Sequence, residues 1–180
     1  MKQHLVRAAF AAMALTGLGL SAAWAQIERL TLGQMVSKTD NCVVGTIASS
    51  EVFRVDHPTD GPELYFTTLR INGKSLYNDA DVSALVTFAG GVMPDGSGVW
   101  NSEAPSADDI AVGNEVVAFY KWTDNMGGDV AANALYAAHG GLFRVIKGRK
   151  AKVVLGRGDG YAIDTNATLA DLKSTIAKLR

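Results

Sequence analysis

Alternation of apolar and polar side chains with a period of two residues is the feature that most restricts the fold of this chain. It is clearest over residues 64–71, where every second side chain faces the same way: Tyr65, Thr67, Leu69 and Ile71. This spacing predicts a half-buried β-strand, because successive side chains of a strand point to opposite faces of its sheet. Further strands are predicted at residues 42–48 (continuing through 52–55 as a long or bent strand), 82–88, 116–122, 134–138, 142–146 and 152–155.

Glycine-rich turns separate these predicted strands. Asn72-Gly73 is predicted to form a turn after residue 71, and Gly90-Gly91 ends the strand at residues 82–88. His139-Gly140-Gly141 is predicted to form a bulge or bend between two strands. Short strands joined in this way, with helices only near the ends of the chain, predict a mainly β fold that is a small antiparallel barrel. Strands do not alternate with helices, which argues against a doubly wound α/β fold.

Two short helices are predicted, one on each side of the strand region. Residues 30–38 contain a capping box, because Thr31 is followed three residues later by Gln34. Thr168 and Asp171 form a second such box. The apolar face that follows it has helical spacing: Leu169, Leu172, Ile176 and Leu179. We expect this C-terminal amphipathic helix to lie across an open edge or end of the barrel.

Several short motifs resemble those of a broad group of exported bacterial proteins. They are Cys42-Val43-Val44-Gly45-Thr46-Ile47, Thr67-Thr68, Val86 with Gly90-Gly91, Gly113-x-Glu115-x-Val117-x-Phe119 and Gly141-x-Phe143-x-Val145. Members of that group are predicted to form small OB-like β-barrels. This chain departs from the pattern at Asn72-Gly73-Lys74, where Lys-Gly is expected after the second strand. The resemblance covers most of residues 26–180, implies an OB-like barrel and supplies no activity.

The first 25 residues have the order of a Sec-type secretory signal. Lys2 and Arg7 form a positive head, residues 8–20 are uncharged and apolar, and Ala23-Trp24-Ala25 is a small-x-small cleavage site. We expect residues 1–25 to be a signal peptide and residues 26–180 a single β-barrel domain, periplasmic or secreted, with no membrane span after cleavage. The alternative is an anchor retained at residues 8–27, but this run is rich in Ala and Gly and only weakly apolar.

Charge and cysteine content restrict the classes of partner. Without Lys2 and Arg7 the chain has 17 − 2 = 15 basic and 18 acidic residues, a net charge of −3. A globally basic nucleic-acid binder is therefore disfavoured. Cys42 is the only cysteine, so no internal disulfide can form. Its apolar neighbours predict a small buried side chain rather than a reactive thiol.

The basic residues are concentrated in one short part of the sequence. Six of them fall within fourteen residues: Arg144, Lys147, Arg149, Lys150, Lys152 and Arg157. If residues 142–146 and 152–155 pair, then Lys147, Arg149 and Lys150 crowd the tip of the hairpin. Such a tip can hold an anionic partner through phosphate or carboxylate contacts. The alternative is a solvated turn that protects an exposed sheet edge from aggregation.

Residues 92–113 form the longest stretch without periodicity. Loops of this length are uncommon in compact domains and are often functional. Trp100 lies within this stretch, where a large aromatic side chain has less reason to be buried. We therefore predict a binding surface that includes Trp100, Lys147, Arg149, Lys150 and Lys152.

The sequence carries no decisive catalytic motif. The two histidines after residue 25 are His57 and His139, and a hydrolase or metal-dependent enzyme would use one of them with nearby carboxylates. No second histidine lies at zinc-ligand spacing from His57. Residues 124–129 offer oxygen ligands for calcium on a flexible turn but do not match an EF-hand loop. We predict no catalytic residue, no metal site and no cofactor.

Three functions follow from these observations. The first is a non-enzymatic exported binding or accessory domain that contacts an anionic polymer or another exported protein through the basic hairpin. The second is a hydrolase or metal-dependent enzyme that uses His57 or His139. The third is a passive component of the envelope.

Overall fold

The computed structural model describes residues 29–57, 59 and 61–180, so the predicted signal peptide at residues 1–25 lies outside the described residues. The described elements are, in chain order, α2 (Leu32–Lys38), β1 (Asn41–Val55), β2 (Leu64–Ser75), β3 (Asp81–Ala89), β4 (Gly91–Val92), β5 (Gly98–Val99), β6 (Glu115–Thr123), β7 (Ala132–Leu135), the 3₁₀ helix η1 (Ala138–Gly141), β8 (Leu142–Lys147), β9 (Lys152–Val154), β10 (Ala167–Thr168) and α3 (Leu169–Leu179). Within this part of the chain no helix is both long enough and apolar enough to cross a bilayer.

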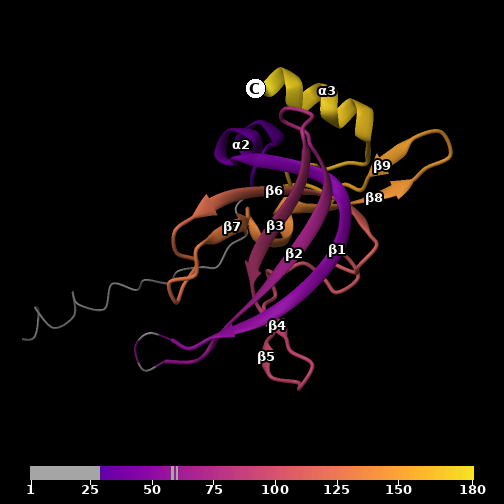
Figure 1. The fold of residues 1–180 in the computed structure, drawn as a ribbon. Coiled ribbons are helices and arrows are strands. Elements are labelled where there is room, and N and C mark those ends of the chain that lie inside the picture. The colour runs from indigo at the N-terminus through magenta and orange to yellow at the C-terminus, as the bar shows by residue number, and fades with distance from the viewer. Residues whose placement is uncertain (1–28, 58, 60) are drawn as a thin grey trace, which may run out of the picture.

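Five of the described strands close a barrel in the order β1-β2-β3-β7-β6, with β6 pairing back onto β1 (Figure 1). The predicted mainly β barrel is therefore confirmed. Its sheet is mixed rather than wholly antiparallel, since β3 and β7 run parallel where Thr87 meets Ala134. The reason is parity: an odd number of strands cannot alternate in direction all the way round a closed barrel.

The barrel closes at β1, which pairs with β2 along one side and with β6 along the other. Residues 43–55 pair with β2, and Asn41–Thr46 pair with β6. The register of β1 with β2 shifts between Ile47 and Ser49. This irregularity lets one long strand bend, because an extra residue on one side of a ladder increases local twist. The long bent strand predicted from residues 42–48 and 52–55 is thus confirmed.

Two facing glycines let β1 and β2 approach closely where β6 also pairs with β1. Gly45 pairs with Gly73. A Cβ added at Gly73 would lie 2.0 Å from the carbonyl oxygen of Val44, and one at Gly45 would lie 2.3 Å from that of Asn72. The predicted turn at Asn72-Gly73 is wrong: both residues lie inside β2, which continues to Ser75. Gly73 is required by close backbone approach rather than by a turn.

The strands carry two apolar cores, one on each face of β6. Val116, Ala118 and Tyr120 face the barrel interior, together with residues such as Ile47 and Leu69. Val117 and Phe119 face a second core shared with the two helices: its members include Met35, Cys42, Phe143, Leu172 and Ile176. Because both faces of β6 are covered, its sequence is continuously apolar from Val116 to Tyr120.

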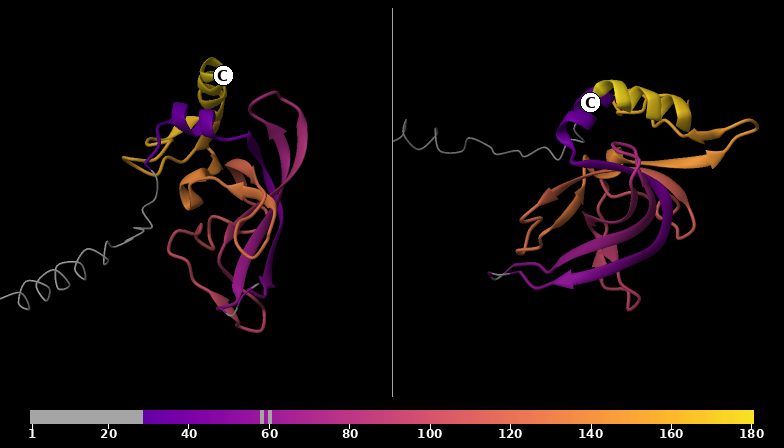
Figure 2. Two further views of the ribbon diagram at one scale, coloured as in Figure 1. Left: turned by 90° about the vertical axis from the view of Figure 1, so that its left-hand side faces the viewer. Right: turned by 45° about the horizontal axis from the view of Figure 1, so that its top comes forward.

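Both predicted helices are present and cover one end of the barrel (Figure 2). Thr31 caps α2 through the predicted box, with Gln34 Oε1 accepting from the Thr31 backbone N at 2.9 Å. Thr168 caps α3 and accepts from the Asp171 backbone N at 3.1 Å. Leu172 and Ile176 are buried, whereas Leu179 is 46% exposed, so the inward face of α3 is shorter than predicted.

The structure also differs from the prediction in β7, in the turn that follows it and in the long loop. Strand β7 covers Ala132–Leu135 instead of residues 134–138, and the bulge or bend predicted at residues 139–141 is a 3₁₀ helix over Ala138–Gly141. Ala137 and Ala138 have φ values of 54° and 51°, and this left-handed backbone ends the strand. The long stretch at residues 92–113 is not wholly irregular, because β5 within it pairs with β4.

Replacing Gly73 with Ala should destabilise the fold by about 1–3 kcal/mol, since a methyl group at this position meets the Val44 carbonyl in a closed ladder. The measurement is the free energy of unfolding in urea. Gly33→Ala in α2 is the control, because its methyl group would make only ordinary contact with Leu179 at 3.6 Å. That variant should be unchanged or stabilised by up to about 1 kcal/mol. Equal stability of the two variants would contradict the close-approach explanation.

Candidate functional site

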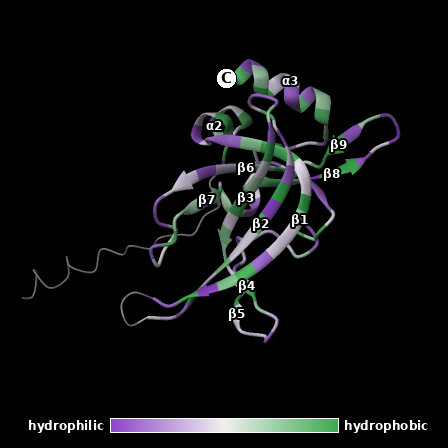
Figure 3. Ribbon diagram, in the orientation of Figure 1, coloured by the Kyte–Doolittle hydropathy of each residue, from purple (hydrophilic) through white to green (hydrophobic). Residues whose placement is uncertain are grey.

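The basic residues lie on a hairpin that projects beyond the barrel. Strands β8 and β9 pair antiparallel, with Val145 opposite Val154 and Lys147 opposite Lys152. The pairing predicted from residues 142–146 and 152–155 is therefore present. The hairpin points away from the barrel in Figure 1 and Figure 2, and its tip is hydrophilic in Figure 3. We call residues 147–152 the basic tip.

The cations of the basic tip are exposed and mostly uncompensated. Lys147, Arg149, Lys150 and Lys152 are all solvent-exposed. Lys152 Nζ lies 2.7 Å from Glu115 Oε1 on β6. In the part of the chain that the structure describes, no ion pair is formed by Lys147, Arg149 or Lys150. Lys147 and Lys152 lie directly opposite each other, and like charges in this arrangement destabilise a strand pair.

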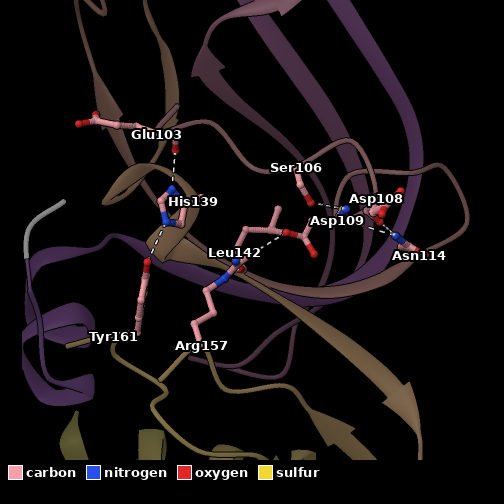
Figure 4. A network of polar contacts seen from close by, with 9 residues as sticks. All are labelled: Glu103, Ser106, Asp108, Asp109, Asn114, His139, Leu142, Arg157 and Tyr161. Carbon is pink, nitrogen blue, oxygen red and sulfur yellow. Dashed lines mark hydrogen bonds and ion pairs between the residues drawn. The ribbon is translucent and has the colours of Figure 1, made fainter. Parts of the chain in front are cut away.

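Arg157, which the sequence groups with these cations, has a different role. Its side chain is 22% exposed, and Nη2 pairs with Asp109 Oδ2 at 2.9 Å (Figure 4). Its Nε donates to the Leu142 carbonyl at 2.9 Å, and its guanidinium lies over the Phe143 ring. Arg157 therefore fastens the loop around Asp109 to β8 and is not available to a ligand.

Asp109→Asn should lower the free energy of unfolding by about 2 kcal/mol, because it removes the charge that balances a largely buried guanidinium. Thermal or urea unfolding measures this loss. The matched control is Asp79→Asn, which removes an exposed carboxylate paired with Lys173. Asp79 has a φ of 61°, which Asn tolerates, so we expect a loss below about 1 kcal/mol. If both variants lose the same amount, Arg157 and Asp109 do not hold the loop.

Trp100 follows β5 and is 86% exposed, as expected from its place in the long loop. The loop that carries it lies at the end of the molecule away from α3, whereas the basic tip projects near the α3 end (Figures 1 and 2). The structure therefore does not bring Trp100 together with Lys147, Arg149, Lys150 and Lys152. The single binding surface predicted from the sequence becomes two separate candidate surfaces.

Both ring nitrogens of His139 are engaged in the fold. Nδ1 lies 2.9 Å from the Glu103 carbonyl oxygen, and Nε2 lies 2.9 Å from the Tyr161 hydroxyl (Figure 4). A carbonyl only accepts, so Nδ1 donates to Glu103, and Nε2 shares the second hydrogen bond with the Tyr161 hydroxyl. The backbone N of His139 donates to the same carbonyl at 2.8 Å. His139 thus joins the long loop to η1 and to the C-terminal segment.

The other candidate metal ligands and bases make hydrogen bonds within local turns. His57 contacts the backbone carbonyl of Thr59 through Nδ1. In the calcium-like segment, Asn125 Nδ2 donates to Asp129 Oδ1 at 3.3 Å, and Asp124 Oδ1 accepts from the Trp122 indole at 3.0 Å. Over residues 29–57, 59 and 61–180 no group of three or more His, Cys, Asp or Glu residues is placed to hold a metal ion.

Cys42 is fully buried in the core between the barrel and the helices. Burial raises the pKa of its thiol well above the ordinary value, because desolvation disfavours the thiolate. The thiolate is the nucleophilic form, so this cysteine packs as a small apolar side chain.

The native protein should not react with Ellman's reagent at neutral pH, while the protein in denaturant should release one equivalent of thiolate per chain. Absorbance of the released product measures this. Rapid reaction of the folded chain would contradict the burial of Cys42.

No family model matches the chain, and neither the curated proteins nor the solved structures contain a significant match to it.

Proposed function

We propose that this protein is an exported, non-enzymatic binding or accessory domain that holds an anionic partner at the basic tip. The observation that carries the proposal is the excess of exposed positive charge on one projecting hairpin. Lys147 faces Lys152 across the ladder, and Arg149 and Lys150 lie at the turn between them. A chain with an expected net charge of −3 that gathers cations on one tip has a localised, not a global, affinity for anions.

We also propose that the barrel is OB-like. Counted along the chain, the five barrel strands lie in the order first, second, third, fifth, fourth, and the fourth returns to the first. The third and fifth form the parallel pair. OB barrels are five-stranded and bind polymeric ligands on their surface. This strand order supports the resemblance to exported OB-like proteins and suits a binding role better than catalysis.

Two details weigh against the hydrolase alternative. His139 already gives both ring nitrogens to the Glu103 carbonyl and the Tyr161 hydroxyl, so its Nε2 is not open to activate a nucleophile. Cys42 lies in the core. An enzyme that uses His57 and a passive envelope component remain as alternatives, and the next experiment distinguishes the passive component from a binding domain.

The triple substitution Lys147→Ala, Arg149→Ala and Lys150→Ala should weaken binding of dextran sulfate by about tenfold or more, because each cation lost removes a salt-dependent contact. Binding is measured by titration calorimetry at about 50 mM and about 200 mM NaCl, and the unmodified protein should bind less tightly at the higher salt.

The matched control is Arg70→Ala, Lys121→Ala and Lys178→Ala, which removes the same charge from exposed positions on β2, β6 and α3. This control should retain most of the affinity. Equal losses in the two triple variants would contradict a local site at the basic tip. No binding by the unmodified protein at either salt concentration would favour the passive component.

A further inference from the structure

A hollow of about 390 Å³ lies at the end of the molecule opposite the basic tip. Its walls come from the start of β2, the end of β3, the residues after β5 and the loop between β6 and β7. The residues that matter for its chemistry are Glu63, Tyr65, Phe66, Trp100, Ser102 and Met126. Parts of the chain that are distant in sequence thus form one concave surface of mixed polarity.

The backbone that carries Trp100 is firmly held, although the indole itself is exposed. Asn101 Nδ2 donates to the Ala89 carbonyl at 3.3 Å, and Asn101 Oδ1 accepts from the Glu103 backbone N at 2.9 Å. A Cβ at Gly98 would lie 2.2 Å from the Gly91 carbonyl oxygen, so β4 and β5 approach closely just before Trp100. An aromatic face presented on a fixed backbone loses little entropy when it binds a ligand.

The polar wall of the hollow is neutral overall and pre-arranged. The Tyr65 hydroxyl donates to Glu63 Oε2 at 3.0 Å, and Arg54 Nη1 lies 3.1 Å from Glu63 Oε1. The charge of the carboxylate is therefore balanced by the guanidinium. Arg54 Nη1 also donates to Glu63 Oε2 at 3.2 Å. A carboxylate accepts about four hydrogen bonds, so Glu63 keeps room for about one hydroxyl group of a ligand.

The hollow is also lined by apolar side chains. Phe66 is 2% exposed and stacks on Phe53 with ring centroids 5.6 Å apart. Met126 contributes a flexible apolar side chain from the loop between β6 and β7. The hollow therefore combines an exposed aromatic face, an apolar lining and a neutral hydrogen-bonding wall.

We propose that this hollow binds a sugar ring of a neutral oligosaccharide. One face of the ring stacks on the Trp100 indole, and its hydroxyls donate one hydrogen bond to Glu63 and exchange others with Ser102. A polyproline segment, which has no backbone N–H, would bury the Glu63 carboxylate without new donors, which is costly. An anionic ligand gains nothing from an arginine already paired with a carboxylate. The hollow contains no residue of the basic tip, so this proposal is tested independently of the proposed function.

The test is calorimetric titration of the full chain with three neutral tetrasaccharides: the N-acetylglucosamine tetramer, cellotetraose and maltotetraose. We expect at least one to bind with a Kd in the low millimolar range or tighter. Trp100→Ala should weaken that binding by about tenfold or more, whereas Trp100→Phe should retain part of it because an aromatic face remains. Trp100 is largely exposed, so thermal unfolding of both variants should match that of the unmodified protein.

The matched control is Trp122→Ala, since Trp122 is 52% exposed and its indole bonds to Asp124 outside the hollow. It should bind the same tetrasaccharide with unchanged affinity. The proposal is overturned if none of the three sugars binds, if Trp100→Ala binds as well as the unmodified protein, or if Trp122→Ala loses binding equally. Binding of decaproline in place of the sugars, or self-association abolished by Trp100→Ala, would assign the hollow to a peptide or to a second copy of the chain.

Discussion

The close contact between Gly45 and Gly73 is the constraint on which the rest of the structure depends. At this point β1 pairs with β2 on one side and with β6 on the other, and the backbones of β1 and β2 leave no room for a Cβ at Gly45 or Gly73. Side chains on either residue would force the ladders apart. Closure removes the free edges of these five strands and leaves β8, β9 and β10 to extend the sheet outward from β6.

The two candidate surfaces follow from this architecture. The hairpin of β8 and β9 continues beyond the closed barrel and therefore projects its cations into solvent, clear of most carboxylates. At the other end, the β1–β2 pair, the end of β3 and the Trp100 loop meet around a hollow whose charged groups neutralise one another. One surface carries exposed cations and the other carries a balanced ion pair beside an exposed indole, so the two ends of the domain differ in chemistry.

Features set by neighbouring residues could be predicted from the sequence, whereas features set by distant contacts could not. The cap at Thr31 and the strand periods depend on local spacing, and the structure confirms them. Asn72-Gly73 has turn-forming residues, but its role is decided by Gly45 on another strand. Arg157 belongs to the cluster of cations in the sequence, but the fold places the distant Asp109 carboxylate beside it. The exposure of Trp100 follows from its loop, but the hollow beside it requires three other segments.

Strand β6 contributes Val116, Ala118 and Tyr120 to the barrel interior and Val117 and Phe119 to the core beneath the helices. A strand shared in this way couples the two cores, since neither can open without exposing one face of the same five residues. Barrel and helices are therefore expected to form one cooperative unit rather than separable foldons. Any ligand that binds only the folded domain would therefore stabilise both cores together by mass action, even if it touched only a few side chains.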